Sequence, residues 1–234
     1  SAAARRGGRP AEAKSWLTLV KHKREFPQWR QRARAEAWLM EGRDEQAPMP
    51  VARCSSTTNP PRLDGILNEP FWETAGRLVP ESHELRTDAE LLIAYDAKHL
   101  YLAARCQKIK NGIYRRDTRP RSYDADLAEH DRVHVSLDID RDYATAYELT
   151  IDHRGWTADA CWLDKSWNHQ WFVASGGTNF WTFEAAIPWD ELTARPPQAG
   201  EAWAIASQRL GPARSVDQAP QHTPPVAYHL LLFK

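Results

Sequence analysis

The sequence predicts a mainly β protein, namely an antiparallel two-sheet β-sandwich preceded by a short N-terminal helical segment. Apolar and polar residues alternate over 131–140 and 146–152, and a period of two means that each strand buries one face. Many short strand patterns follow one another, with turn signals such as residues 96–98 between them. No long helices alternate with these strands, and this favours a sandwich over a parallel sheet.

Residues 1–43 form the predicted helical segment. Apolar residues recur at helical spacing in two sets, which are Trp16, Leu19 and Val20, then Trp29, Ala33, Ala37 and Met40. Pro27 separates the sets and suits the first turn of a second helix, and Gly42 favours a helix end. The first ten residues are small and basic and are expected to fray. The segment is interpreted as the tail of a preceding helical domain or as an arm that packs on the next one.

A proline-rich linker is predicted at 44–61, where four prolines lie without any periodicity. Residues 62–234 are predicted to form the sandwich. Its strands are expected at 89–95, 99–106, 131–140, 146–152, 156–163, 171–175, 180–187, 202–210 and 227–233. Residues 188–192 indicate one helical turn, and the polar stretch 107–130 is interpreted as a functional loop.

Composition excludes several classes of partner. The chain has 31 basic and 31 acidic residues, so no global field directs it to nucleic acid. Residues 1–47 carry 11 Lys and Arg against 6 Asp and Glu, but no base-reading motif accompanies this excess. No run of about 18 apolar residues is present, so no membrane span is expected. The three cysteines lack the spacing of metal or redox sites and are expected to be small buried residues.

The polar side of the two clearest strands is the first candidate site. It comprises Arg132, His134, Ser136, Glu148, Thr150 and Asp152. This set is richer in hydrogen-bonding and titratable groups than plain solvation requires. We therefore expect a functional site on or beside that face.

Several segments of residues 60–234 match the motifs of a known family in type and order. They read LDGILNEPFWETA at 63–75, LIAYDAKHLYL at 92–102, DRVHVSLD at 131–138 and WTFEAAIPW at 181–189. Together they resemble the family 9 carbohydrate-binding modules and their relatives in the DOMON-like superfamily. The helical first 45 residues lie outside this resemblance.

The resemblance implies a β-sandwich of jelly-roll type with one or more structural calcium ions. It also implies a non-catalytic module that binds a carbohydrate or related polyol and belongs to a larger, extracytoplasmic protein. Other domains of that parent protein, such as a glycoside hydrolase, would be its partners. In the family, two tryptophans sandwich a terminal sugar ring, and polar side chains bond its hydroxyls, as sugar chemistry requires.

The family's sugar site transfers to this sequence only in part. Ala128 stands where the first sandwiching tryptophan is expected, and His134 replaces the sugar-reading glutamate. Thr150 aligns with an arginine of the next strand, whereas Gln208 keeps the glutamine of a later strand. The second tryptophan has no counterpart in 216–226. The expected sugar-binding face therefore carries His134, Thr150 and Gln208 without the aromatic pair.

An aromatic cluster offers a replacement for that pair. Its tryptophans are Trp156, Trp162, Trp167 and Trp171, with Asn168 and His169 between the last two. We expect Trp167 or Trp171, together with Asn168, to contact the ligand. The alternative is that these rings pack on the core or under the N-terminal helices.

Asp138, Asp140 and Asp142 are the candidate metal ligands, because calcium favours several carboxylate oxygens. Tyr143 stands where an EF-hand needs glycine and Leu149 where it needs glutamate, so an EF-hand is excluded. The alternative is a solvated turn in which aspartates cap backbone groups.

Two other functions remain open. The module could be a structural or protein-interaction domain whose sugar face has decayed. Haem binding, known among DOMON-like relatives, would need a Met/His or bis-His pair, but Met40 and Met49 lie outside the predicted sandwich. An enzyme is not expected, because no nucleophile motif is present.

Overall fold

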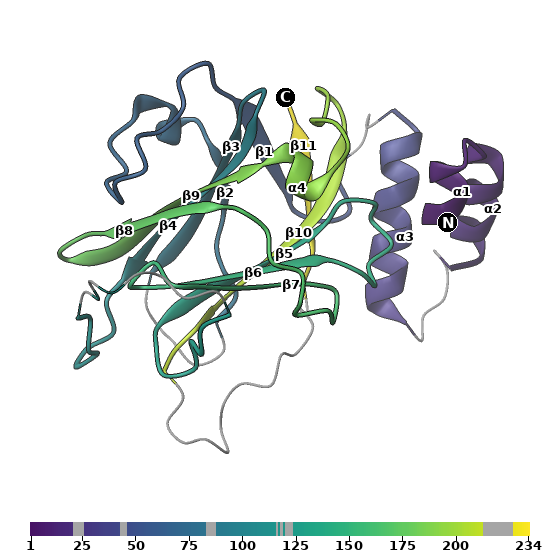
Figure 1. The fold of residues 1–234 in the computed structure, drawn as a ribbon. Helices are drawn as coiled ribbons and strands as arrows, with labels where there is room; N and C mark the ends of the chain where they lie inside the picture. Colours follow the sequence, from purple (N-terminus) through teal and green to yellow (C-terminus); the bar gives the residue numbers. More distant parts are fainter. Residues whose placement is uncertain are drawn as a thin grey trace.

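The computed structural model of the chain describes residues 1–20, 26–42, 46–82, 88–115, 117, 119, 124–212 and 227–234. Three helices, α1 (Ala2–Arg6), α2 (Pro10–Val20) and α3 (Pro27–Met40), lie together beside the β part of the molecule (Figure 1). Pro27 stands in the first turn of α3, as predicted. The expectation of a frayed start is wrong, because α1 is helical and buries Ala4. None of the described helices is long and apolar enough to span a membrane.

Eleven strands make up the described β part. They are β1 (Val51–Ser56), β2 (Gly76–Leu78), β3 (Ala89–Tyr95), β4 (His99–Gln107), β5 (Arg132–Asp138), β6 (Tyr147–Asp152), β7 (Thr157–Cys161), β8 (Phe172–Gly176), β9 (Phe180–Pro188), β10 (Ala202–Leu210) and β11 (His229–Phe233). A 3₁₀ helix, η1 (Pro70–Glu73), precedes β2, and α4 (Trp189–Leu192) follows β9. All nine predicted strands and the predicted helical turn are confirmed to within a few residues.

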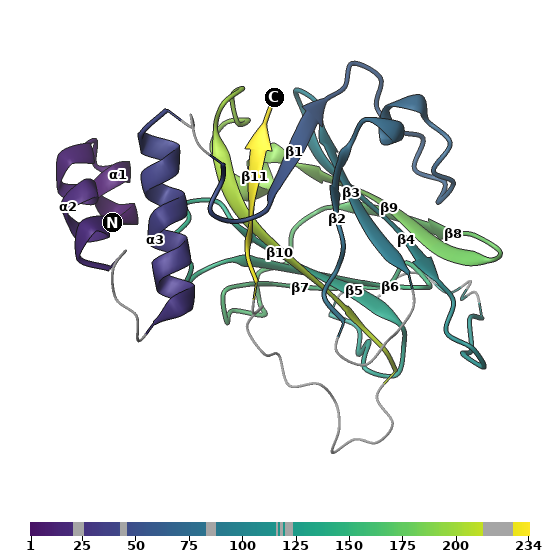
Figure 2. The same cartoon turned by 180° about the vertical axis from the view of Figure 1, so that it is seen from behind.

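The prediction of two separate antiparallel sheets is not matched. The strands form one mixed, curled sheet in the order β7-β6-β5-β10-β11-β1-β3-β4-β9-β8, with β2 paired to β3. The central strand β1 runs parallel to β11 through 51–54 and parallel to β3 through 55–56, so it joins the two halves (Figure 2). Residues 51–56 were assigned to the linker, and that assignment is wrong. The prolines lie on either side of this strand and not within it, so their presence does not argue against a strand there.

The hydrophobic core lies between the two facing halves of the curled sheet. Val133, Val135 and Leu137 of β5 point into it from one half, and Ile93 and Leu102 point into it from the other. Cys54 and Cys106 are buried in the same core, as expected, whereas Cys161 is half-buried; all three are free. Because the inward residues of β5 are apolar, its alternate residues must face away from the core.

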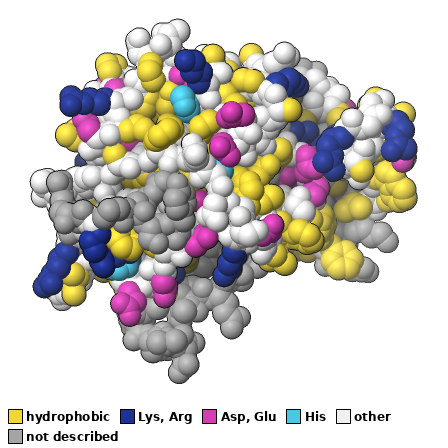
Figure 3. Space-filling view, viewed as in Figure 1, with side chains coloured by type: hydrophobic (Ala, Val, Ile, Leu, Met, Phe, Trp, Pro, Cys, Tyr) yellow, Lys and Arg dark blue, Asp and Glu magenta, His cyan; other side chains and the backbone are white. Residues whose placement is uncertain are grey.

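Helix α3 packs on the outer surface of β10 and β11. Ala35, Trp38 and Leu39 contact a small cluster that includes Ala204 and Ala206 of β10. Away from this contact, the N-terminal helical segment leaves large apolar side chains exposed, on the right in Figure 3. These side chains are Trp16, Leu19, Phe26 and Trp29.

A buried carboxylate anchors the arm. Glu36 of α3 accepts hydrogen bonds from Arg5, from Arg141 Nε at 2.9 Å and from Tyr143 Oη at 3.0 Å. A carboxylate shielded from water requires such partners. The N-terminal segment is therefore fixed to the β part by ionic as well as apolar contacts.

Candidate functional site

Three residues expected to read a sugar lie in one row across the sheet. Gln208 of β10 is opposite His134 of β5, and His134 is opposite Thr150 of β6. The next row holds Ser136 opposite Glu148. These residues alternate with core residues, so they share the outer surface of this half of the sheet.

Hydrogen bonds tie the two rows together. The His134 Nδ1 atom lies 2.9 Å from the Thr150 hydroxyl, and its Nε2 atom lies 2.7 Å from a Glu148 carboxylate oxygen. The Ser136 hydroxyl donates to the same Glu148 oxygen at 2.6 Å. Both nitrogens of the imidazole are thus held, which fixes the orientation of the ring.

The rows are shielded from solvent to different degrees. His134 is 6% exposed and Gln208 is 7% exposed, whereas Thr150 and Glu148 are half-buried. Among the described residues, the side-chain amide of Gln208 makes no hydrogen bond. An amide with free donors and acceptors can bond a ligand hydroxyl in either direction.

Two other members of the polar set are structural. The Arg132 guanidinium donates to the carbonyl oxygens of Leu127, Ala128 and Gly211, at 3.0 to 3.2 Å. Asp152 caps the following turn and pairs with Arg154 at 2.6 Å. Sequence alternation placed both residues on the polar side but could not separate turn-building groups from ligand-facing ones.

The structure contradicts the expected stacking role of Trp171. Its side chain is 2% exposed within the main core and donates to Asp159 Oδ2 at 2.9 Å, so neither face of the ring is open. Trp167 is half-buried and stacks on His169 at 4.2 Å between ring centroids. Asn168 is exposed, and within the described part of the chain its side chain bonds only the Ser166 carbonyl oxygen, at 3.4 Å. A period-two pattern cannot assign a tryptophan in a loop to the core, and this caused the error.

Trp162 is the tryptophan of the cluster that remains open. It is 58% exposed and has a backbone φ of 58°, a region that bulky residues rarely occupy. Its backbone N–H donates to the Ala146 carbonyl oxygen at 2.7 Å, directly before the β6 strand that carries Glu148 and Thr150. An exposed aromatic ring on a strained backbone is a candidate functional position.

The three aspartates expected to bind calcium do come together. Their ligand oxygens all lie within 4.8 Å of one another, and burial raises the pKa of Asp138 to about 7, with a further contribution from the neighbouring acids. Hard oxygen ligands at this separation fit a calcium ion. Asp138 and Asp142 also accept backbone N–H groups of the 142–145 turn, as the capping interpretation expects. Arg6 of the helical arm pairs with Asp140 at 3.0 Å, so the loop already has one cationic partner.

The pair formed by His130 and His153 does not suit haem. The rings of His130 and His153 pack edge to face with centroids 5.3 Å apart, too close to hold a macrocycle between them. Burial lowers the pKa of both. The expected absence of the second tryptophan from 216–226 concerns a segment outside the described residues.

The fold can be compared with solved structures. A family 9 carbohydrate-binding module from Caldicellulosiruptor kristjanssonii, in complex with cellotriose, matches with a TM-score of 0.53 at 14% identity. The match covers 78% of this chain and 93% of that one. The chain has a family 9-like fold. A family 9 carbohydrate-binding module from the same organism, in complex with glucose, matches with a TM-score of 0.52 at 14% identity, over 78% and 95% of the two chains.

The family 9-like fold also matches a candidate carbohydrate-binding protein from Bacteroides uniformis. Here the TM-score is 0.59 at 9% identity, and the match covers 79% of this chain and 99% of that chain. No protein-family model matches the sequence, and no curated protein matches it. The likeness thus lies in the fold, and the wider DOMON-like relationship stays a prediction.

Proposed function

We propose that the protein is a non-catalytic module that binds a neutral sugar or related polyol on the outer surface of β5, β6 and β10. The row formed by Gln208, His134 and Thr150 carries this proposal. In the structures with a similar fold, family 9 modules hold cellotriose and glucose. Sugar hydroxyls need directional partners, and this row offers an amide, a hydroxyl and an imidazole.

Within this proposal each residue has a distinct role. Gln208 bonds a ligand hydroxyl directly, because its amide has no partner in the described part of the chain. His134 is oriented by Thr150 and Glu148 and holds the row rigid. Trp162 offers the aromatic face that Trp171 does not, since the C–H face of a sugar packs on an aromatic ring.

The wider setting is also a proposal. The module would belong to a larger extracytoplasmic protein whose other domains act on the bound carbohydrate. A calcium ion would be held by Asp138, Asp140 and Asp142, whose oxygens fit such an ion. It would neutralise the acidic loop that follows β5.

A structural or interaction module is the second candidate. It predicts that Trp167 and Trp171 are buried, and the observed burial of Trp171 favours it. Coverage of β10 by α3 also favours it, because the arm occupies part of the same outer surface.

Isothermal titration against a panel of neutral saccharides, including glucose and cellotriose, tests the first candidate. Replacing Gln208 by Ala removes one polar contact and should weaken binding about tenfold, the usual effect of a lost hydrogen bond in a shielded site. The exposed Gln28 of α3 provides a matched control, and Gln28→Ala should leave affinity unchanged.

The outcome separates the two candidates. If Gln208→Ala and Gln28→Ala bind the saccharide with equal affinity, the ligand binds elsewhere on the protein. Absence of binding to the whole panel would leave the structural role as the function of this module.

A further inference from the structure

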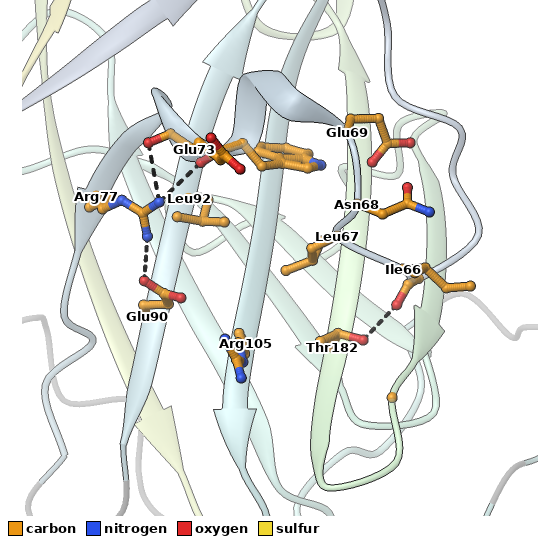
Figure 4. A pocket seen from close by; sticks show the side chains of 13 residues that line it. Ile66, Leu67, Asn68, Glu69, Glu73, Arg77, Glu90, Leu92, Arg105 and Thr182 are labelled. Carbon is orange, nitrogen blue, oxygen red and sulfur yellow. Dashed lines mark hydrogen bonds and ion pairs between the residues drawn. The ribbon is translucent and has the colours of Figure 1, made fainter.

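A cavity lies on the other half of the sheet, away from the Gln208 row. It has a volume of about 520 Å³, within the range of small-ligand pockets. The outer surface of β3, β4 and β9 forms its floor, and residues of the segment from Gly65 to Glu73 form one wall (Figure 4).

The cavity exists because the covering segment shields one row of the sheet and not the next. Trp72 of η1 packs over the row of Leu92 and Ala103. The adjacent row, in which Arg105 is opposite both Glu90 and Thr182, borders the cavity instead. The floor therefore changes from apolar to polar across one strand spacing.

The walls are held rigidly. Buried Glu184 accepts hydrogen bonds from the backbone N–H of Gly65 at 2.9 Å and from the Trp72 indole at 3.1 Å. Gly65 has a φ of +77°, and a Cβ there would lie 2.5 Å from the Ser175 backbone, so only glycine fits this close approach. A preformed cavity needs little rearrangement to bind a ligand.

Arg77 closes another side. It donates to Glu90 at 2.6 Å and to the Trp72 carbonyl oxygen at 3.1 Å, as the dashed lines in Figure 4 show. The positive charge of Arg77 is therefore balanced by partners in the wall of the cavity itself.

Three polar groups at the cavity keep free bonding capacity among the described residues. Glu69 Oε2 is buried without a hydrogen-bond partner, although its other oxygen accepts from the Arg62 backbone N–H at 2.9 Å. The Arg105 guanidinium lies over the Phe180 ring at 4.1 Å and pairs with no carboxylate of the described residues. The side-chain amide of Asn68 is exposed and makes no hydrogen bond to any described residue. A buried acceptor left unsatisfied is costly unless something binds it.

We propose that this cavity is a second binding site, for one neutral sugar ring or a polyol of similar size. Leu67 supplies an apolar surface for C–H groups, and Glu69, Arg105 and Asn68 supply acceptors and donors for hydroxyls. The lining holds two arginines against three glutamates, so neither a strongly anionic nor a strongly cationic ligand is favoured. This site uses none of the residues of the Gln208 row and stands independently of the function proposed for that row.

Nuclear magnetic resonance of the full chain tests the site, with the Trp72 indole N–H as reporter. The titrants are glucose, galactose, mannose, xylose and cellotriose, each up to about 10 mM, ten times a Kd of about 1 mM. We expect one of them to shift the Trp72 resonance with saturation. Glu69→Gln and Arg105→Ala should each weaken that response about tenfold, because each removes a charge-assisted hydrogen bond.

Two controls make the result decisive. Glu12→Gln, on exposed α2, should not alter the response, and Gln208→Ala should alter binding only at the other site. If no sugar in the panel gives a saturating shift of Trp72, or if Glu69→Gln and Arg105→Ala bind as tightly as the unaltered chain, the proposal is wrong. If Gln208→Ala loses binding at the Gln208 row but keeps the Trp72 response, the two sites are separate, as proposed.

Discussion

Glu184 shows how one buried carboxylate organises a distant segment. It lies on β9, yet it holds the backbone of Asp64 and Gly65 and the indole of Trp72, more than 100 residues away in sequence. Burial raises the pKa of Glu184 to about 7, against the opposing effect of these N–H donors. The resemblance placed Glu184 and residues 63–75 in two separate motifs, and the structure shows that they form one unit.

This raised pKa predicts a dependence of stability on pH. The folded state holds a proton on Glu184 up to about pH 7, whereas the unfolded state releases it near 4.5. The folded state therefore binds more protons between these values, and this group's contribution to stability falls as pH rises through that window. Melting temperatures of Glu184→Gln and the unaltered chain, measured from below pH 4.5 to above pH 7, should differ in slope there. A constant difference would show that the pKa of Glu184 is the same in the folded and unfolded states.

The β5–β6 connection brings together the acidic loop and the helical arm. Asp140 pairs with Arg6, and the carbonyl oxygens of Asp140 and Arg141 accept hydrogen bonds from Arg5 at 2.9 and 3.1 Å. Two arginines of α1 thus lie where a metal would also be attracted. The β5–β6 connection is either a calcium-binding loop that the arginines of α1 also contact, or a turn that these arginines alone stabilise.

Calcium titration separates these possibilities. If the three aspartates hold the ion, added calcium should raise the melting temperature, since a ligand at about 100 times its Kd stabilises the folded state by about 2.7 kcal/mol. EDTA should reverse the effect, and Asp138→Asn should abolish it. Asp190→Asn, at an exposed position of α4, is the matched control. An unchanged melting temperature in calcium would leave Arg5 and Arg6 as the cations of this loop.

A buried ion pair of the β5–β10 half lies where the two halves of the molecule meet. Arg209 of β10 donates to Asp131 through two nitrogens, at 3.0 and 2.6 Å. Asp131 also accepts from Trp181 of β9 at 2.9 Å and from Tyr114 at 2.6 Å. Contacts from both halves therefore meet on one carboxylate inside the curled sheet.

Removal of that carboxylate should destabilise the fold as a whole. Asp131→Ala leaves the buried Arg209 guanidinium without a counter-charge, a change that costs about 3–5 kcal/mol. Urea unfolding followed by tryptophan fluorescence would measure the loss, with Asp190→Ala as control. A loss below about 1 kcal/mol, the value of an exposed pair, would contradict the assigned role.

Much of the β part could be predicted because alternation is a local property. The polar row of β5 and β6 follows directly from a period of two, and Gln208 joins it through a motif resemblance. Strand β1 was missed because its six residues carry flanking prolines and a weak apolar pattern. Trp171 was misplaced for a similar reason, since its burial depends on Asp159 and on strands far away in the sequence.

The sequence by itself determined which residues form strands, which side of each strand is polar, and which family the fold resembles. Only the tertiary structure decided that β1 joins both halves in parallel, that Trp162 rather than Trp171 is open, and that α1 meets the acidic loop. The physical reason is that periodicity says which face of an element is buried but not against what. Those partners lie far apart along the chain, and they are selected by packing and by the need to satisfy buried charges.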